Sequence, residues 1–125
     1  MYQSLTVFEI AGALGAHAGR SQALTAQNIA NADTPGYRPQ RLTAFEEAYR
    51  TGASLTAVTT RSNHITSAPS RFDSRTETGA AISPNGNGVS LEKEMMEGID
   101  ADRSHKRALA IYRHGMTVLR LAIGR

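Results

Sequence analysis

The chain of 125 residues contains no cysteine and no tryptophan, and only 6% of its residues are aromatic. Without cysteine it has no disulfide framework, no thiolate metal site and no cysteine nucleophile. Its length allows at most one domain with a modest core. Because alanine inflates the hydrophobic fraction of 40% and buries little area, we expect marginal stability for the isolated chain and a gain of structure on assembly.

Basic residues are absent from the first nineteen positions, and no stretch is long and apolar enough to span a bilayer. The apolar run at 10–16 ends in Ala16-His17-Ala18, which resembles a signal-peptidase site. A secretory signal also needs a basic segment before that run, whereas Glu9 precedes it here. We therefore expect no cleaved signal peptide.

The excess of positive charge is small, with a formal net charge of +3 and a pI near 9.7. Basic residues are interleaved with apolar ones near the C-terminal end, at Arg103, Lys106, Arg107, Arg113, Arg120 and Arg125. This interleaving favours a solvated helix face, and a small nucleic-acid binder is the alternative. No zinc-finger, OB, RRM or helix-turn-helix signature accompanies it, so we expect no nucleic acid among the partners.

Motifs for catalysis and cofactor binding are missing as well, including the P-loop, the dinucleotide-binding loop and the nucleophile elbow. Carboxylates are paired at 46–47 and at 92 and 94. Adjacent helical residues point to different sides, and the second pair suits the start of a helix. Asp102 and His105 share a helix face, but two further metal ligands are missing. We predict that the chain is not an enzyme and holds no metal and no cofactor.

The first long helix is predicted over 4–31, with Ser4 as its N-cap and its last turn near Ala30. Residues in this stretch alternate at spacings of three and four, which is typical of a coiled-coil seam. The seam positions are Val7, Ile10, Leu14, His17, Ser21, Leu24, Asn28 and Asn31. Its polar members weaken the seam but can fix its register.

The second long helix is predicted over 90–123, with Ser90 as N-cap and Gly124 as its end. Its seam is nearly unbroken, at Leu91, Met95, Gly98, Asp102, His105, Leu109, Tyr112, Met116, Leu119 and Ile123. The middle of the seam is soft, because Gly98 costs roughly 1 kcal/mol relative to alanine and two of its neighbours in the seam are polar. The C-terminal half is firmly apolar.

Between the helices, 32–89 is predicted to be a turn followed by an irregular segment, with a short amphipathic helix around 42–49, strand-like composition at 55–60 and a loop at 83–88. The predicted fold is mainly α. Long N- and C-terminal helices pack as an antiparallel coiled-coil-like pair, and the middle holds a short helix and possible short strands. Two helices cannot bury a wide apolar stripe on each, so the remainder must meet other copies or other subunits.

The stretch 28–38 closes the first helix and is the most informative part of the chain. Thr34 precedes a proline, which disfavours the α conformation, and Pro35 cannot continue a helix. Pro35 and Gly36 suit the two central positions of a type II turn, because only glycine adopts positive φ cheaply. Tyr37 then leaves the helix end at a fixed angle.

This stretch resembles the N-terminal signature of the flagellar rod and hook family. The residues that carry the resemblance are Asn28, Ile29, Asn31, Thr34, Pro35, Gly36 and Tyr37. A second stretch at 83–95 is similar to the N-G-N-x-V-x-L-E-K-E-M start of the last helix in a short proximal rod member. Ser90 stands where aspartate is common in the family, and it keeps the capping chemistry. The two stretches lie toward opposite ends of the chain, and the middle is not diagnostic.

The resemblance implies a structural subunit of the proximal rod of the bacterial flagellar basal body. Such subunits polymerise through their terminal helices into a tubular drive shaft, which joins the membrane ring and export apparatus to the distal rod and transmits torque. The implied partners are other copies, FliE, the rod proteins FlgC and FlgF-like, the export gate and the membrane–supramembrane ring. The implied location is the periplasmic rod, reached through the flagellar type III system. The alternatives are another short rod subunit, or a helical adaptor that binds a partner helix.

Overall fold

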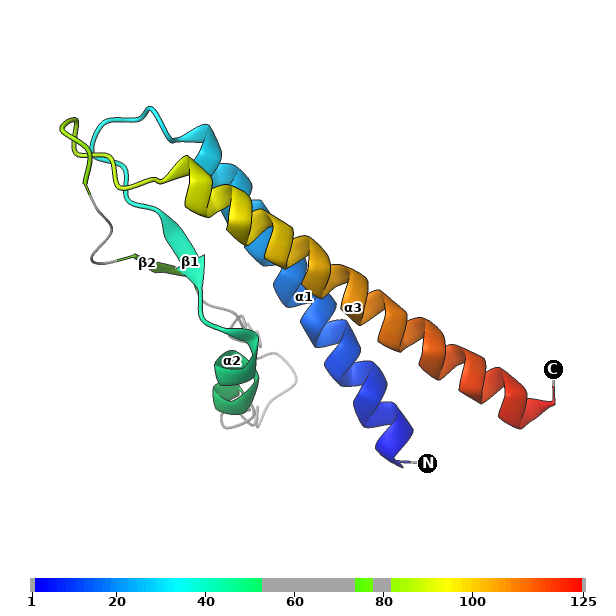
Figure 1. The fold of residues 1–125 in the computed structure, drawn as a ribbon. Coiled ribbons are helices and arrows are strands. Elements are labelled where there is room, and N and C mark those ends of the chain that lie inside the picture. The colour runs from blue at the N-terminus through cyan, green and yellow to red at the C-terminus, as the bar shows by residue number, and fades with distance from the viewer. Residues whose placement is uncertain (1, 53–73, 78–81, 125) are drawn as a thin grey trace, which may run out of the picture.

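The structure is a computed structural model that describes residues 2–52, 74–77 and 82–124. Its elements are α1 (Tyr2–Ala30), β1 (Gln40–Leu42), α2 (Phe45–Gly52), β2 (Ser74–Thr76) and α3 (Leu91–Ile123). The two long helices lie side by side with both chain termini at the same end, so they run antiparallel (Figure 1). The predicted mainly α fold with paired terminal helices is therefore confirmed.

The ends of α3 follow the capping chemistry expected from the sequence. The Ser90 side chain accepts a hydrogen bond from the Lys93 backbone N–H, and Gly124 adopts the left-handed conformation at φ +77°. The start of α1 differs from the prediction, because the helix begins at Tyr2 and Ser4 lies inside it. Ser4 is therefore not the N-cap. Serine is tolerated inside a helix, at a small cost in helix propensity.

Small side chains dominate the contact between α1 and α3. Buried positions recur every seven residues, at Ala11, Ala18 and Thr25 on α1 and at Glu94, Ala101 and Ala108 on α3. The backbones approach closely along these lines, since a Cβ placed on Gly15 would lie 3.7 Å from the Ala108 Cβ. All the buried hydrophobic residues of the described part are alanines, as expected for a chain with a weak core of its own.

The larger seam residues of α3 lie beside this buried line, at the edge of the contact between the helices, where Tyr112 packs against Phe8 of α1. Leu91, Met95, Leu109, Tyr112, Leu119 and Ile123 are exposed, and Met116 is half-buried. On α1, Leu14 and Leu24 are half-buried. The closest contact between the helices is made one position away from the α3 seam, because alanine permits a closer approach of the helices than leucine or methionine. Whether these residues act in assembly stays a prediction.

The strands β1 and β2 and the short helix α2 lie on one side of the helix pair (Figure 1). The strands β1 and β2 pair antiparallel, with Arg41 opposite Arg75. The predicted short helix is α2, but Leu42 belongs to β1 rather than to the helix. The loop at 83–88 is present as predicted, with a turn closed by the Gly86 N–H and the Ser83 carbonyl at 2.8 Å. The strand-like stretch at 55–60 lies outside the described residues.

Within the described ranges, no helix combines the length and the apolarity that crossing a bilayer requires.

Candidate functional site: a buried polar junction

The turn after α1 has the geometry that the sequence predicts. The Tyr37 backbone N–H donates to the Thr34 carbonyl at 3.3 Å. Gly36 has φ +74°, which is the value required at the third residue of a type II turn. The chain therefore reverses within four residues of the motif and returns along the helix pair as β1.

Asn87 fastens the loop before α3 to this turn. Its side chain is 2% exposed. The Nδ2 group donates to the carbonyls of Asn31 at 2.9 Å and of Thr34 at 2.7 Å. Its Oδ1 accepts from the Val89 backbone N–H at 2.7 Å. One buried amide thus supplies the last carbonyls after α1 with donors and shapes the approach to α3.

The two glycine turns also touch through their backbones. The Gly36 N–H donates to the Asn85 carbonyl at 3.2 Å, and the Gly88 N–H donates to the Tyr37 carbonyl at 3.0 Å. Gly86 has φ +82°, and a Cβ placed there would lie 3.4 Å from the Gly36 Cα and nitrogen. Glycine is needed at 86 for both reasons, the backbone conformation and the close approach.

Asn28 lies at the centre of the junction with its hydrogen-bonding capacity fully used. It is 1% exposed. Its Nδ2 donates to the Gln40 carbonyl at 2.9 Å and to Glu94 Oε2 at 3.1 Å. Its Oδ1 accepts from the Gln40 N–H at 3.0 Å and the Tyr37 hydroxyl at 3.2 Å. Two donors and two acceptor sites are all that an amide side chain offers. Because all four are used, the four contacts together require an asparagine at this position.

Glu94 is completely buried, at 0% exposure. Besides accepting from Asn28, it pairs through Oε1 with Arg41 Nη2 at 2.7 Å. Arg41 also pairs with Glu77 at 2.6 Å and with Glu97 at 3.2 Å. Lys93 in turn pairs with Glu77. These five residues and Asn28, Asn87, Tyr37 and Gln40 form what we call the polar junction, which links α1, β1, the residue after β2 and α3.

The charges of the polar junction stabilise one another. The hydrogen bond from Lys93, followed by that from Arg41, lowers the pKa of Glu77 below its usual value. Burial alone would lower the pKa of Arg41, but its hydrogen bond to Glu77 and the charges of Glu94, Glu77 and Glu97 outweigh burial and raise it. The Glu77 carboxylate is therefore held ionised between two cations, which leaves it poorly suited to proton transfer.

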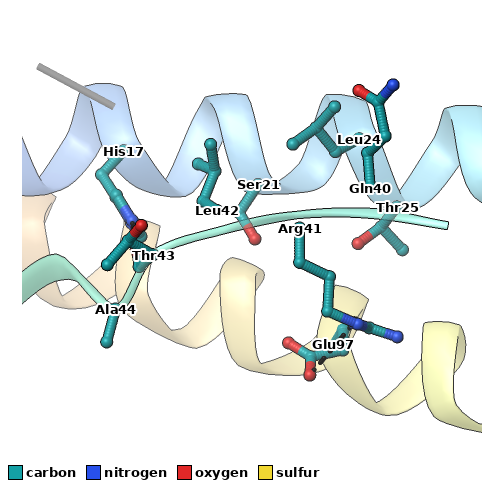
Figure 2. Close-up of a pocket in the computed structure, with 10 residues that line it drawn as sticks. All are labelled: His17, Ser21, Leu24, Thr25, Gln40, Arg41, Leu42, Thr43, Ala44 and Glu97. Atoms are coloured by element: carbon teal, nitrogen blue, oxygen red, sulfur yellow. Dashed lines mark hydrogen bonds and ion pairs between the residues drawn. The ribbon is translucent and has the colours of Figure 1, made fainter. Parts of the chain in front are cut away.

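A half-open pocket of about 170 Å³ lies beside the junction, between α1 and β1 (Figure 2). His17 Nε2 lies 2.9 Å from the Thr43 carbonyl oxygen, and its ring packs edge-on against Phe45 at 5.6 Å. Across the pocket, Arg41 points toward Glu97 (Figure 2). Ligand sites for small molecules usually have roughly 300 Å³ or more, so this space is too small to serve as one.

The structure shows where each group of predicted site residues lies. Asn28, Asn31, Thr34, Gly36 and Tyr37 meet in or next to the polar junction, as their hydrogen bonds show. Ile29 is 39% exposed. Pro35 is exposed in the turn. Asp102 pairs with Lys106 at 2.6 Å, and no group of three or more potential metal ligands occurs in the part of the chain that the structure describes.

Sequence reasoning missed the residues that bind the side chains of the motif in the folded chain. Glu94 was interpreted only through the helix dipole, and Arg41 and Glu77 carry no local signal at all. Asn87 lies in a stretch that resembles the family, but nothing in the spacing shows that it reaches Asn31. A buried polar partner separated by 66 residues, as Asn28 and Glu94 are, becomes visible only when the helices are paired.

The fold and the junction define a class: a helical protein whose paired terminal helices are fixed by a buried polar network. Residues 13–38 match the family model described as flagella basal body rod protein. The matched segment runs from the middle of α1 through the turn, and so includes Asn28 and Tyr37. The match supports a structural subunit of the flagellar basal body rod, a family that is not enzymatic and assembles with other rod proteins. No curated protein matches the chain significantly.

Proposed function

We propose that this chain is a structural subunit of the proximal rod, of the FlgB type. The start of α3 supports FlgB, since the stretch at 83–95 is similar to the corresponding stretch of that protein. Hook and distal-rod members carry large inserted domains, for which 125 residues leave no room. The R-A-Y-E-A-N-type string that FlgC-like chains carry near their end is absent, although a FlgC-like subunit remains the nearest alternative.

The observation that carries the proposal is the contact between the two stretches that resemble the rod family. Asn28 of the first stretch bonds to Glu94 of the second at 3.1 Å. Asn87 of the second bonds to the carbonyls of Asn31 and Thr34 in the first. The motif residues therefore hold the two terminal helices in one register, which is what a subunit that polymerises through those helices requires.

The mechanism in this proposal is mechanical. Contacts between unlike surfaces of neighbouring copies do not close into a ring, and they generate a helical tube. Large apolar residues remain exposed along α3, among them Met95, Met96, Leu109 and Leu121. An exposed apolar surface of this extent marks an interaction site. Torque would pass through many packed contacts, so no single residue carries the function.

The proposed partners follow from the same role. They are further copies of the chain, FliE, FlgC and FlgF-like rod proteins, the export gate and the membrane–supramembrane ring. The proposed route to the periplasmic rod is the flagellar type III system, without a cleaved signal peptide. A core made of alanines supports this route, because such a chain unfolds at little cost before export.

The direct test is electron microscopy of basal bodies from a strain that lacks this chain, with the wild-type gene restored as control. We expect membrane rings without a rod in the deletion strain. A normal rod would reject the proposal and favour an adaptor, which forms a discrete small complex with a partner helix.

A double variant tests the motif itself. Pro35→Ala with Gly36→Val removes both the helix stop and the residue with positive φ, so we expect failure of rod assembly and loss of motility. Asp33→Ala, an exposed change in the same turn, is the matched control and should swim normally. Normal motility of the double variant would contradict the role given to this turn.

A further inference from the structure

One broad side of the helix pair is not covered by any of the described residues, and it differs from the side on which β1 lies. On α1 this side carries Phe8, Gly12, Gly15, Gly19 and Gln22, at alternating spacings of four and three. On α3 it carries the seam that runs from Leu91 to Ile123. We call these two stripes together the open face.

Two contacts place both stripes on the same side of the pair. The rings of Phe8 and Tyr112 pack edge-to-face with centroids 5.2 Å apart. A Cβ placed on Gly98 would lie 3.6 Å from the Thr25 methyl carbon. Residues at spacings of three and four share a helix face, so the face of α1 with Phe8 and the face of α3 with Tyr112 form one surface.

The opposite side of the pair is covered by the chain itself. Arg41 of β1 reaches Glu97 and Glu94 there, and His17 contacts Thr43. The open face has no such cover from the described residues, and Leu91, Met95, Leu109 and Tyr112 on it are 42–60% exposed.

We propose that the open face binds a second copy of this chain before assembly, with the two α3 helices antiparallel. The α3 seam is self-complementary in this arrangement. In an antiparallel coiled coil the two seam positions alternate across the interface. A twofold axis between Asp102 and His105 sets each of these residues opposite the other one in the second copy.

The polar interruptions of the seam then meet one another instead of apolar side chains. The same axis sets Gly98, the smallest seam residue, opposite Leu109, and it sets Met95 opposite Tyr112 and Leu91 opposite Met116. Every large apolar position in this range therefore faces an apolar or small partner. The glycine, the aspartate and the histidine in the middle of the seam weaken its apolar character. In this arrangement they fix the register in which two copies of the seam pair.

Charges beside the seam fit the same arrangement. Glu92 and Arg113 lie on one flank, each following a seam residue, and both are exposed. No hydrogen bond or ion pair of either side chain occurs among the described residues. The antiparallel register brings Glu92 of one copy close to Arg113 of the other, twice per dimer.

The glycines of α1 allow the two α1 helices of the proposed dimer to pack over the paired α3 helices. Gly15 lies beside Ala108 and Thr25 beside Gly98, so Gly19 is level with the centre at Asp102 and His105. The twofold axis brings the α1 helix of the second copy over this stripe. Because glycine has no side chain, it permits a close helix–helix approach there. The resulting four-helix bundle keeps the seam out of water until the chain joins a larger assembly.

Sedimentation velocity of the purified chain, from about 1 to about 100 μM, tests the proposal. We expect a dimer whose dissociation constant rises at least about tenfold in Leu109→Glu. Leu121→Glu is the matched control, since Leu121 is 73% exposed but lies away from the open face, and it should leave the dimer intact. Met95→Glu repeats the test if Leu109→Glu loses helicity. A monomer at every concentration, or equal effects of Leu109→Glu and Leu121→Glu, would overturn the proposal.

Orientation is tested by disulfide formation, because the chain has no cysteine of its own. Leu91→Cys and Met116→Cys proteins should cross-link when mixed, and neither should cross-link with itself. Self-cross-linking of each protein alone would show a parallel pair and overturn the proposal. The Asp102→His with His105→Asp exchange should keep the dimer, whereas His105→Asp alone sets two aspartates against each other and should weaken it. These outcomes leave the rod test untouched, since that test reads assembly in cells.

Discussion

The two ends of the helix pair are built by different means. At the junction end, Asn28, Asn87 and Glu94 are at most 2% exposed, and each makes several hydrogen bonds or ion pairs. At the end with the chain termini, Val118, Leu121 and Ile123 are 50–76% exposed. The contrast teaches that polar contacts fix the geometry at one end, while at the other end large apolar side chains stay exposed, where the proposed assembly would cover them.

Removing the buried carboxylate should have the largest effect. Glu94→Ala removes one of the two acceptors of the Asn28 side-chain amide and leaves Arg41 without its buried partner. We expect a loss of about 3 kcal/mol in the free energy of unfolding, measured by urea denaturation. Glu92→Ala, an exposed change two residues away, is the control and should stay within about 0.5 kcal/mol. A loss in Glu94→Ala no larger than the control's would mean that the junction does not fix this end.

Asn28→Ala should follow closely. It strips partners from the Gln40 backbone, the Tyr37 hydroxyl and Glu94, so buried polar groups are left unsatisfied. The expected loss is about 2–3 kcal/mol by the same measurement. The exposed neighbour serves for comparison, since Ile29→Ala should cost much less. Equal losses for the two variants would contradict the special role of Asn28.

Gly86→Ala should cost more than Gly36→Ala, although both residues have positive φ. The strain of the left-handed conformation, about 1–2 kcal/mol, applies to each. Only at Gly86 would the added Cβ meet backbone, 3.4 Å from Gly36, whereas nothing lies within 4 Å at Gly36. Thermal unfolding of the two variants measures the difference. The reverse order would show that the close approach of the two turns is not tight in solution.

Acid should weaken the junction end by a smaller amount, below about 1 kcal/mol from Glu77. Because the pKa of Glu77 is lowered from 4.5 in the folded chain, its contribution is present above that value. It is lost as the pH falls through the lowered pKa. Glu77→Gln should therefore lose less stability between about pH 6 and about pH 3 than the wild type. Glu46→Gln, whose side chain is 87% exposed, should leave the acid dependence unchanged.

The features that could be predicted from the sequence are local, and the features that could not be predicted depend on contacts between distant segments. The limits of α3, the turn at Thr34–Tyr37 and the pairing of the helices follow from local capping, turn chemistry and periodicity. The buried line on α3 was placed one position away, because periodicity favours large apolar residues and gives no weight to Ala101 and Ala108. The partnership of Arg41 with Glu94 has no local signature, since it depends on where β1 lies after the turn.

The hydrogen bond between Asn28 and Glu94 joins residues that are 66 positions apart. Closing a loop of that length carries an entropic cost that must be met before the contact contributes anything. Helical turns form from neighbours on a far shorter timescale. The junction therefore forms late, after the helices. If the chain is exported as proposed, it passes through the export channel with its helical propensity but without its paired helices. The register of the two helices is set only once both have arrived on the same side.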